Sequence, residues 1–131
     1  MSFWGVRKGF KRRQSDSLFS VLVRIKRGYR CEKCGKKHDT SSMNIGLSHF
    51  KGRSRESVRY DEENVDVLCN IPCHNYFEEH KKDYEKWKEE RMGTKAYKLL
   101  LVRSEQTGRY DPFVEKILCK RFREEMKLLT N

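Results

Sequence analysis

Two pairs of cysteines constrain this chain more than any other feature of its sequence. Cys31 and Cys34 form a C-x-x-C pair before Gly35, and Cys69 and Cys73 form a C-x-x-x-C pair further along. Gly35 allows the tight turn that the first pair requires. Two such pairs can converge on one zinc ion held by four thiolates, and that zinc would be structural because no coordination position stays open. The alternative is that the four cysteines are small buried hydrophobic residues.

The length and the apolar pattern bound the class of protein. The chain has 131 residues, enough for one domain, and 36% of them are hydrophobic. No apolar run approaches the roughly 18 residues of a membrane span, and the basic N-terminus lacks the features of a secretory signal. We therefore expect an intracellular protein with no membrane partner and with reduced cysteines. The fifth cysteine, Cys119, is expected to pack within the last helix.

The charge of the chain points to a polyanionic partner. There are 30 Lys and Arg against 19 Asp and Glu, which gives a net charge of +11. On so small a domain this excess favours nucleic acid. Residues 1–40 carry 12 basic and 3 acidic groups, whereas residues 41–80 carry 4 basic and 7 acidic groups. Acidic residues in the middle of a basic chain are what a divalent-cation site that faces a polyanion would need. Helices with interspersed charges would give a similar charge distribution.

Hydrophobic periodicity and turn residues predict an α+β fold in a single domain, with a basic arm over 1–15, a core over 16–92 and a helical extension over 93–131. The long helix of the core would carry an apolar stripe, and we expect His80 to pack inward on it. The predicted elements are a helix capped by Asp16 or Ser17 and ended by Gly28, strands over 43–50 and 65–68, and helices over 73–91, 94–103 and from Pro112 to Leu129.

The order of these elements resembles a known group of nucleases. A first cysteine pair is followed by a strand ending in Ser48-His49, a charged loop, Asn64, a second strand, the second cysteine pair, and His74 at a helix start. This order resembles the HNH endonucleases, also called ββα-metal or His-Me finger nucleases, in their form with a four-cysteine zinc knuckle. Looser features over residues 16–103 are similar to the NinG (Rap) family of phage recombination proteins. The resemblance implies a zinc-stapled ββα-metal core with flanking helices.

The resemblance also implies a set of catalytic residues. His49 would be the general base, because a neutral imidazole is available near pH 7. Asn64 would brace the loop and orient the His49 ring, and His74 would ligate a catalytic Mg²⁺ or Mn²⁺ ion. Many HNH nucleases carry an acidic or histidine metal ligand immediately before the base, and this chain has Ser48 there. A serine hydroxyl is a poor ligand, although it could hold a metal-bound water.

Arginines and lysines supply the expected contacts with DNA. Those of the arm would bind the phosphate backbone without selecting a sequence. Those of the loop between the strands would either clamp the scissile phosphate or pair with neighbouring acidic residues. The DNA-binding candidates are Arg7, Lys8, Lys11, Arg12 and Arg13 in the arm and Arg53, Arg55 and Arg59 in the loop.

Two functions therefore follow from the sequence. The first is a metal-dependent HNH endonuclease that acts on duplex or branched DNA, encoded by a phage and working in the cytoplasm of a bacterial host. The second is a zinc-knuckle nucleic-acid-binding module whose HNH site no longer cleaves. His49, Asn64 and His74 favour the first, and Ser48 favours the second. The sequence leaves the oligomeric state open, with a homodimer as one alternative.

Overall fold

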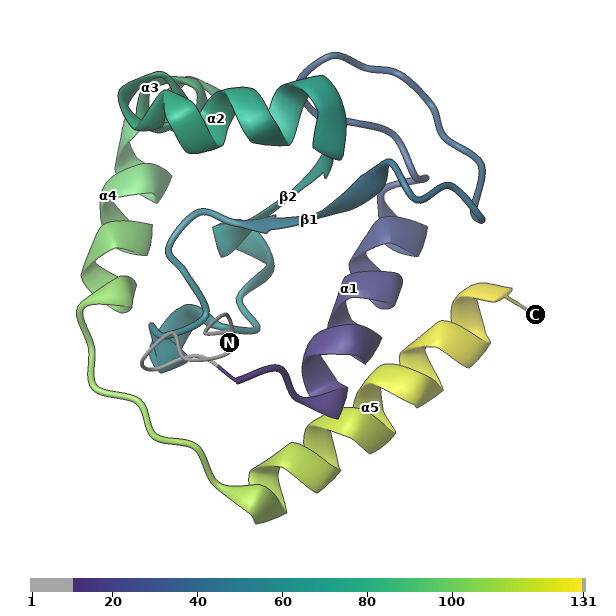
Figure 1. The fold of residues 1–131 in the computed structure, drawn as a ribbon. Coiled ribbons are helices and arrows are strands. Elements are labelled where there is room, and N and C mark those ends of the chain that lie inside the picture. Colours follow the sequence, from purple (N-terminus) through teal and green to yellow (C-terminus); the bar gives the residue numbers. More distant parts are fainter. Residues whose placement is uncertain (1–10, 131) are drawn as a thin grey trace, which may run out of the picture.

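The computed structural model describes residues 11–130, in which helices surround a two-stranded sheet (Figure 1). In the view of Figure 1, α2 and α3 lie above the sheet, α4 descends on the left and α5 runs along the lower right edge. Residues 1–10 of the expected arm lie outside the described part. The elements are α1 (Gln14–Lys26), β1 (Ile45–His49), η2 (Glu56–Val58), η3 (Glu62–Asn64), β2 (Val65–Cys69), η4 (Asn70–His74), α2 (Asn75–Glu79), α3 (Lys81–Met92), α4 (Thr94–Ser104) and α5 (Pro112–Thr130).

The sheet is an antiparallel hairpin at the centre of the fold. Ile45 lies opposite Cys69 at one end of the ladder, and His49 lies opposite Val65 at the other. Every residue of β2 is buried, which explains its run of valine and leucine. The two strands predicted from the sequence are therefore confirmed, with shifted ends. Their register separates the second cysteine pair from His49 by the length of the hairpin.

The first helix begins earlier than its sequence predicts. It starts at Gln14 rather than after a cap at Asp16 or Ser17. Asp16 occupies the third helical position, and its carboxylate accepts a hydrogen bond of 2.7 Å from the backbone N–H of Arg13. The acidic residue thus satisfies a free N–H from inside the first turn, and the expected cap position is wrong. The end of the helix before Gly28, whose φ is +71°, is confirmed.

The single helix predicted over 73–91 is wrong, because the chain breaks at His80. There φ is −128° and ψ is 69°, and α2 and α3 lie on either side. His80 is exposed rather than packed in the core, and its ring stacks on Tyr76 with centroids 4.0 Å apart. The break sets Phe77 of α2 parallel to Tyr84 of α3, with their ring centroids 4.4 Å apart. Both aromatic rings are buried, and the Tyr84 hydroxyl contacts Ser48 of the hairpin.

The last two helices follow the sequence closely. The predictions over 94–103 and from Pro112 are confirmed by α4 and α5. Phe122 of α5 is buried against Phe19 of α1, with their ring centroids 5.4 Å apart. Cys119 is also buried, as expected. The structure is a small α+β fold, and no helix among residues 11–130 has the length and apolarity to cross a membrane.

A buried ion pair joins α1 to the loop between the strands. Asp16 and Arg59 are 2% and 1% exposed, and Nη2 of Arg59 donates to Asp16 Oδ2 at 2.6 Å while Nε donates to Oδ1 at 2.9 Å. Arg59 also donates to the carbonyls of Arg53 and Lys11. Burial opposes ionisation of Asp16, but the bonds from Arg59 and from the Arg13 backbone outweigh it and lower the Asp16 pKa.

We predict that Asp16→Ala lowers the free energy of unfolding by about 3–5 kcal/mol at pH 7, because it leaves the Arg59 charge buried without its carboxylate. Since folding lowers the pKa of Asp16, this stabilisation is present above the unfolded pKa of about 3.9 and is lost as the pH falls through the folded pKa. Urea unfolding at pH 7 and near pH 3 measures both effects. Glu90→Ala, at an exposed position of α3, is the control. Equal unfolding midpoints for the two variants would contradict the prediction.

Candidate metal centre and catalytic residues

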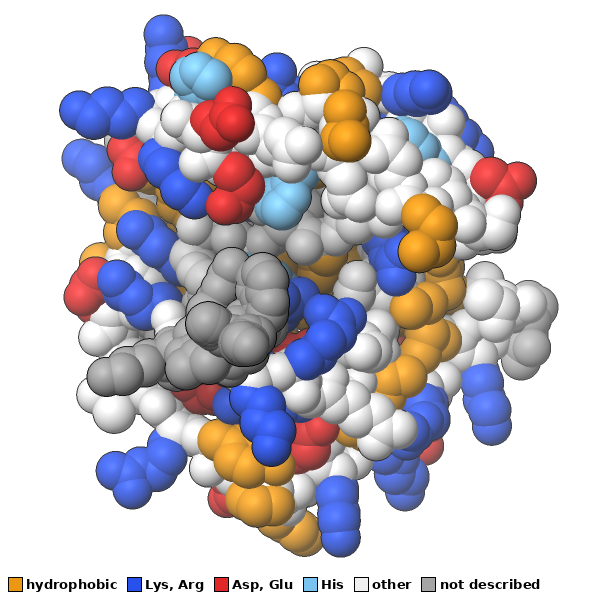
Figure 2. Space-filling model, in the orientation of Figure 1, with side chains coloured by type: hydrophobic (Ala, Val, Ile, Leu, Met, Phe, Trp, Pro, Cys, Tyr) orange, Lys and Arg blue, Asp and Glu red, His pale blue; other side chains and the backbone are white. Residues whose placement is uncertain are grey.

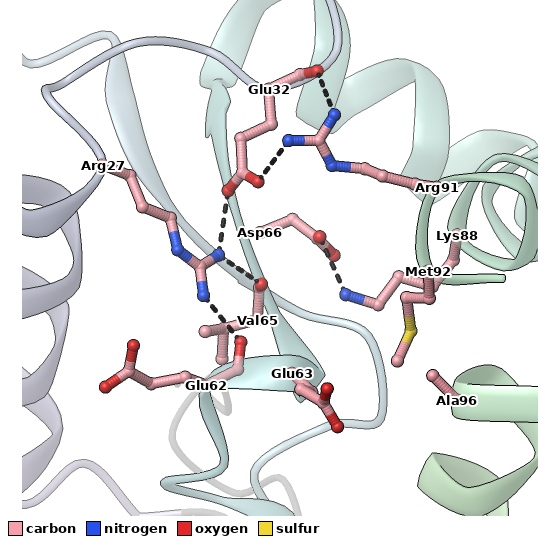
Figure 3. A pocket seen from close by; sticks show the side chains of 10 residues that line it. All are labelled: Arg27, Glu32, Glu62, Glu63, Val65, Asp66, Lys88, Arg91, Met92 and Ala96. Atoms are coloured by element: carbon pink, nitrogen blue, oxygen red, sulfur yellow. Dashed lines mark hydrogen bonds and ion pairs between the residues drawn. The ribbon is translucent and has the colours of Figure 1, made fainter.

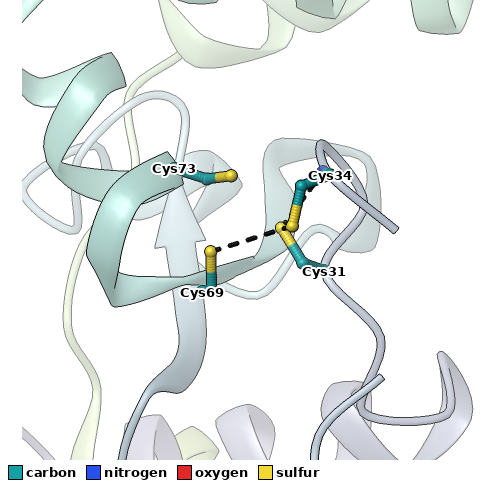
Figure 4. Close-up of side chains that lie close together, drawn as sticks. All are labelled: Cys31, Cys34, Cys69 and Cys73. Carbon is teal, nitrogen blue, oxygen red and sulfur yellow. Dashed lines mark hydrogen bonds between the residues drawn. The ribbon is translucent and has the colours of Figure 1, made fainter. Parts of the chain in front are cut away.

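The four paired cysteines meet in space (Figure 4). Their Sγ atoms all lie within 4.8 Å of one another, and the Sγ atoms of Cys34 and Cys69 are 4.0 Å apart. Four sulfurs around one zinc, each at about 2.3 Å, lie roughly 3.8 Å apart. The donor set and its spacing therefore fit a zinc ion, and no disulfide joins these thiols. The structure thus supports the predicted cysteine metal centre.

The local backbone explains how each pair is presented. In the first pair, the N–H of Gly35 donates to the carbonyl of Cys31 at 2.8 Å, and Gly35 adopts a φ of +80°. An isolated bridge between Arg30 and Lys37 closes this turn. In the second pair, Cys69 ends β2 and Cys73 lies in the wider π-turn of η4, which accommodates the additional residue between them.

The thiols differ in their tendency to ionise. Burial raises the pKa of Cys31, but hydrogen bonds from the backbone of Cys34, Cys69 and Lys33 outweigh it and lower that pKa to about 7. Burial raises the pKa of Cys73, and its hydrogen bonds with the neighbouring cysteines raise it further. Four thiolates so close together repel one another, so full ionisation requires a cation between them. A divalent metal supplies that charge.

We predict that the purified protein binds about one zinc per chain and that Cys34→Ser abolishes this stoichiometry. Removing zinc with a chelator should lower the thermal unfolding temperature, because the metal joins the first turn to the end of β2. Elemental analysis and thermal melts measure the two effects. Cys119→Ser is the matched control, since Cys119 lies on α5 outside the cluster and should retain full zinc. Folded wild-type protein without bound metal would contradict the prediction.

His49 is held in one orientation at the end of β1. Its Nε2 lies 3.0 Å from the carbonyl oxygen of Arg59, so Nε2 carries the proton and donates it. Its Nδ1 is buried and has no hydrogen-bond partner among the residues described. Burial and the positive charge of Arg53 lower the pKa of His49 to about 4. At neutral pH the ring is therefore uncharged, with the Nδ1 lone pair available to accept a proton.

Asn64 braces the loop that orients this histidine. It is fully buried, and its Nδ2 donates to the carbonyls of Lys51 at 2.8 Å and Val58 at 3.1 Å. Its Oδ1 accepts a bond of 2.9 Å from the backbone N–H of Lys51. The loop that Asn64 ties together carries the Arg59 carbonyl. These three bonds fix the two parts of the loop to each other.

His74 lies at the end of η4, directly after Cys73. Its side chain is 34% exposed, and its Nε2 is 3.6 Å from Oε2 of Glu78 one turn later. Within the described part of the chain, the cysteine cluster is the one group of three or more His, Cys, Asp or Glu residues close enough to hold a metal. Among the described residues, His49 and His74 therefore do not form a metal site with three protein ligands.

Ser48 faces away from His49, because successive residues of a strand alternate between faces. The Ser48 hydroxyl is buried and lies 3.0 Å from the Tyr84 hydroxyl. The Tyr84 hydroxyl donates to the Asp66 carboxylate at 2.7 Å, and Nζ of Lys88 donates to the same carboxylate at 2.8 Å. Burial raises the pKa of Asp66 despite the charge of Lys88. The sequence analysis missed this network, although Asp66 stands in an otherwise apolar strand.

A charged pocket opens beside this network, between α1, β2 and α3 (Figure 3). Two of its arginines, Arg27 and Arg91, both bind Glu32, at 2.9 and 2.8 Å. The Glu32 carboxylate also accepts the backbone N–H of Val67 at 2.7 Å. Glu32 follows Cys31, so these contacts attach the first cysteine turn to β2. These contacts of Glu32 therefore help to hold the first cysteine pair in position.

The predicted DNA-binding residues differ in exposure and in partners. Arg7 and Lys8 lie outside the described residues, and Lys11 and Arg12 are exposed. Arg13 forms two bonds of 2.8 Å with Glu56, and Arg55 pairs with Glu105 at 3.2 Å. The expectation that Arg59 contacts DNA is wrong, because its guanidinium is buried against Asp16. Arg53 lies 3.7 Å from Asp16 and remains partly exposed, at 18%.

Comparisons with protein-family models, with curated proteins and with solved structures find no match to this chain.

We predict that His49 stays neutral across pH 5–8 and titrates only near pH 4, because burial and the Arg53 charge both disfavour the imidazolium. NMR chemical shifts of the His49 ring measured against pH report this directly. In Arg53→Gln the pKa of His49 should rise, since the larger of the two positive charges that lower it is removed. An ordinary pKa near 6.5 in the wild-type protein would contradict the buried, single-tautomer site.

Proposed function

We propose that this chain is a metal-dependent HNH-type endonuclease that hydrolyses DNA phosphodiester bonds, encoded by a phage and acting in recombination or DNA processing. The observation that carries the proposal is the state of His49. Its Nε2 is committed to the Arg59 carbonyl, and its uncharged Nδ1 has no partner among the described residues. An imidazole held in one tautomer, with Nδ1 unprotonated and without a partner among these residues, would take a proton from a water that DNA binding brings against it.

The elements around His49 support the same function. Asn64 holds the loop that supplies the orienting carbonyl, and the cysteine cluster joins the hairpin to the turn that carries His74. Each part has a role that phosphodiester hydrolysis requires: a base, a rigid support for that base, and a metal ligand held in place by its neighbouring cysteine. The order of strand, loop, strand and helix in which these parts occur is that of the HNH motif.

A divalent cation would bind beside His74. Its Nε2 and the Glu78 carboxylate are 3.6 Å apart, and two ligands of one ion with bonds of about 2.1 Å lie roughly 3–4 Å apart, so the pair fits. Such an ion would neutralise the scissile phosphate and the departing oxygen. His74 and Glu78 would position the phosphate, and DNA oxygens would complete the coordination. His49 would take the proton of the attacking water at Nδ1.

Positive charge on the described surface supports DNA as the substrate. The net charge is +11, and Lys11 and Arg12 are exposed at the start of the described chain. Figure 2 shows many basic side chains over the face that it presents. Arg53 is close enough to His49 for its charge to lower the pKa of that ring, so its guanidinium is placed to contact a phosphate there. Lys11, Arg12 and Arg53 are the basic residues that we propose contact DNA.

The structure also offers one observation in favour of the second function, a nucleic-acid-binding module that does not cleave. Ser48 is turned toward Tyr84 and away from His49, so the strand contributes no metal ligand beside the base. In that case His49 and Asn64 would be retained as structural supports of the loop. Cleavage measurements separate the two functions.

We predict that His49→Ala lowers the DNA cleavage rate by about 10²–10⁴-fold, because it removes the general base, while DNA affinity stays within a few-fold. Plasmid nicking and fluorescence anisotropy measure the two quantities. His80→Ala is the matched control, since His80 is exposed at the α2–α3 break and should cleave like the wild type. A His49→Ala protein that nicks at the wild-type rate would show that His49 is not the base.

A further inference from the structure

The last helix has one face packed on the fold and another open to solvent. Its inner face packs against α1 through Cys119 and Phe122, which are 4% and 5% exposed. On its outer face Phe113, Ile117 and Leu128 are 71%, 50% and 81% exposed. Figure 1 shows α5 along the outer edge of the fold, so this outer face has no neighbour among the described elements. Large exposed apolar side chains along one helix mark an interaction surface.

The spacing of the outer face is that of a coiled coil. Its positions follow one another at intervals of three, four, three and four residues, an average of 3.5. Apolar residues stand toward both ends of this stripe, and an Arg–Glu pair stands in its middle. We call this stripe the α5 seam, and it consists of Val114, Ile117, Arg121, Glu124 and Leu128.

We propose that the α5 seam is a dimer interface, on which a second copy of this chain packs its own α5 in the antiparallel direction. When the two helices cross at a two-fold axis at the level of α5 between residues 122 and 123, Ile117 faces the partner's Leu128. The same axis sets Arg121 against the partner's Glu124, and each pairing occurs twice. Apolar residues thus meet apolar residues, and opposite charges meet at the centre.

Other arrangements of the same two helices lack this agreement. In a parallel pair, Arg121 would face the partner's Arg121. An antiparallel pair displaced by one heptad would set Ile117 against the partner's Arg121, which buries a charge against an apolar side chain. Arg121 and Glu124 are both exposed, and the contact of Arg121 with Glu125 on the same helix is a long one of 3.9 Å, so both side chains can reach a partner. Charge complementarity within the seam therefore selects a second copy in one register.

Sedimentation velocity of the full chain, measured over about 1–100 µM, tests the proposal. We expect reversible dimerisation of the wild type. Glu124→Arg and Arg121→Glu should each weaken it at least tenfold, because like charges then meet twice at the centre of the interface. An equimolar mixture of the two variants should restore dimers. One chain then carries two arginines at the centre of its seam and the other carries two glutamates, so opposite charges meet in both pairings. Thermal melts establish that each variant is folded, which their exposed positions lead us to expect.

Arg123→Glu is the matched control, because it makes the same change of charge at an exposed position outside the seam. It should dimerise like the wild type. Three results would overturn the proposal: a wild type that stays monomeric over the whole range, single charge reversals that dimerise as tightly as the wild type, or a mixture of the two reversals that fails to associate. The proposal is independent of the nuclease function, since no DNA or cleavage enters the measurement.

Discussion

Four cysteine sulfurs that converge at one end of a short hairpin determine how the rest of this small fold is arranged. They come from a turn after α1 and from the junction between β2 and η4, so their meeting joins the first helix, the sheet and the second half of the chain. Glu32 reinforces the junction by binding the backbone of Val67 and the side chains of Arg27 and Arg91. A metal at this point would stabilise contacts that a core of this size supports only weakly.

Buried polar groups hold the other end of the hairpin. The Asp16–Arg59 pair attaches the loop to α1, and Asn64 ties the loop to itself. The Arg59 side chain therefore serves stability, while its carbonyl fixes the His49 ring. One residue thus connects the ion pair that stabilises the fold to the imidazole that we propose as the base.

Much of the fold was predictable because its signals are local. The residue pattern predicted the two strands and the last two helices. The spacing of the cysteines predicted the cluster of four thiols. The break at His80 was not predicted, because no glycine or proline marks it in the sequence, and the packing of Tyr84 beside Phe77 against the hairpin involves residues as distant as Ser48. The burial of Arg59 also could not be foreseen, since its partner Asp16 lies 43 residues away in the sequence. For the same reason the inward turn of Ser48 toward Tyr84 depends on a distant helix.

The central claim is that the neutral His49 ring and a divalent cation together hydrolyse DNA. Nicking of supercoiled plasmid by the zinc-loaded wild-type protein, with Mg²⁺ or Mn²⁺ either added or withheld, tests this most directly. The account predicts conversion to nicked circles that requires the added cation at pH 7–8, where His49 is neutral. Folded protein that binds the plasmid but leaves it supercoiled with every divalent cation would contradict the account and identify a binding module instead.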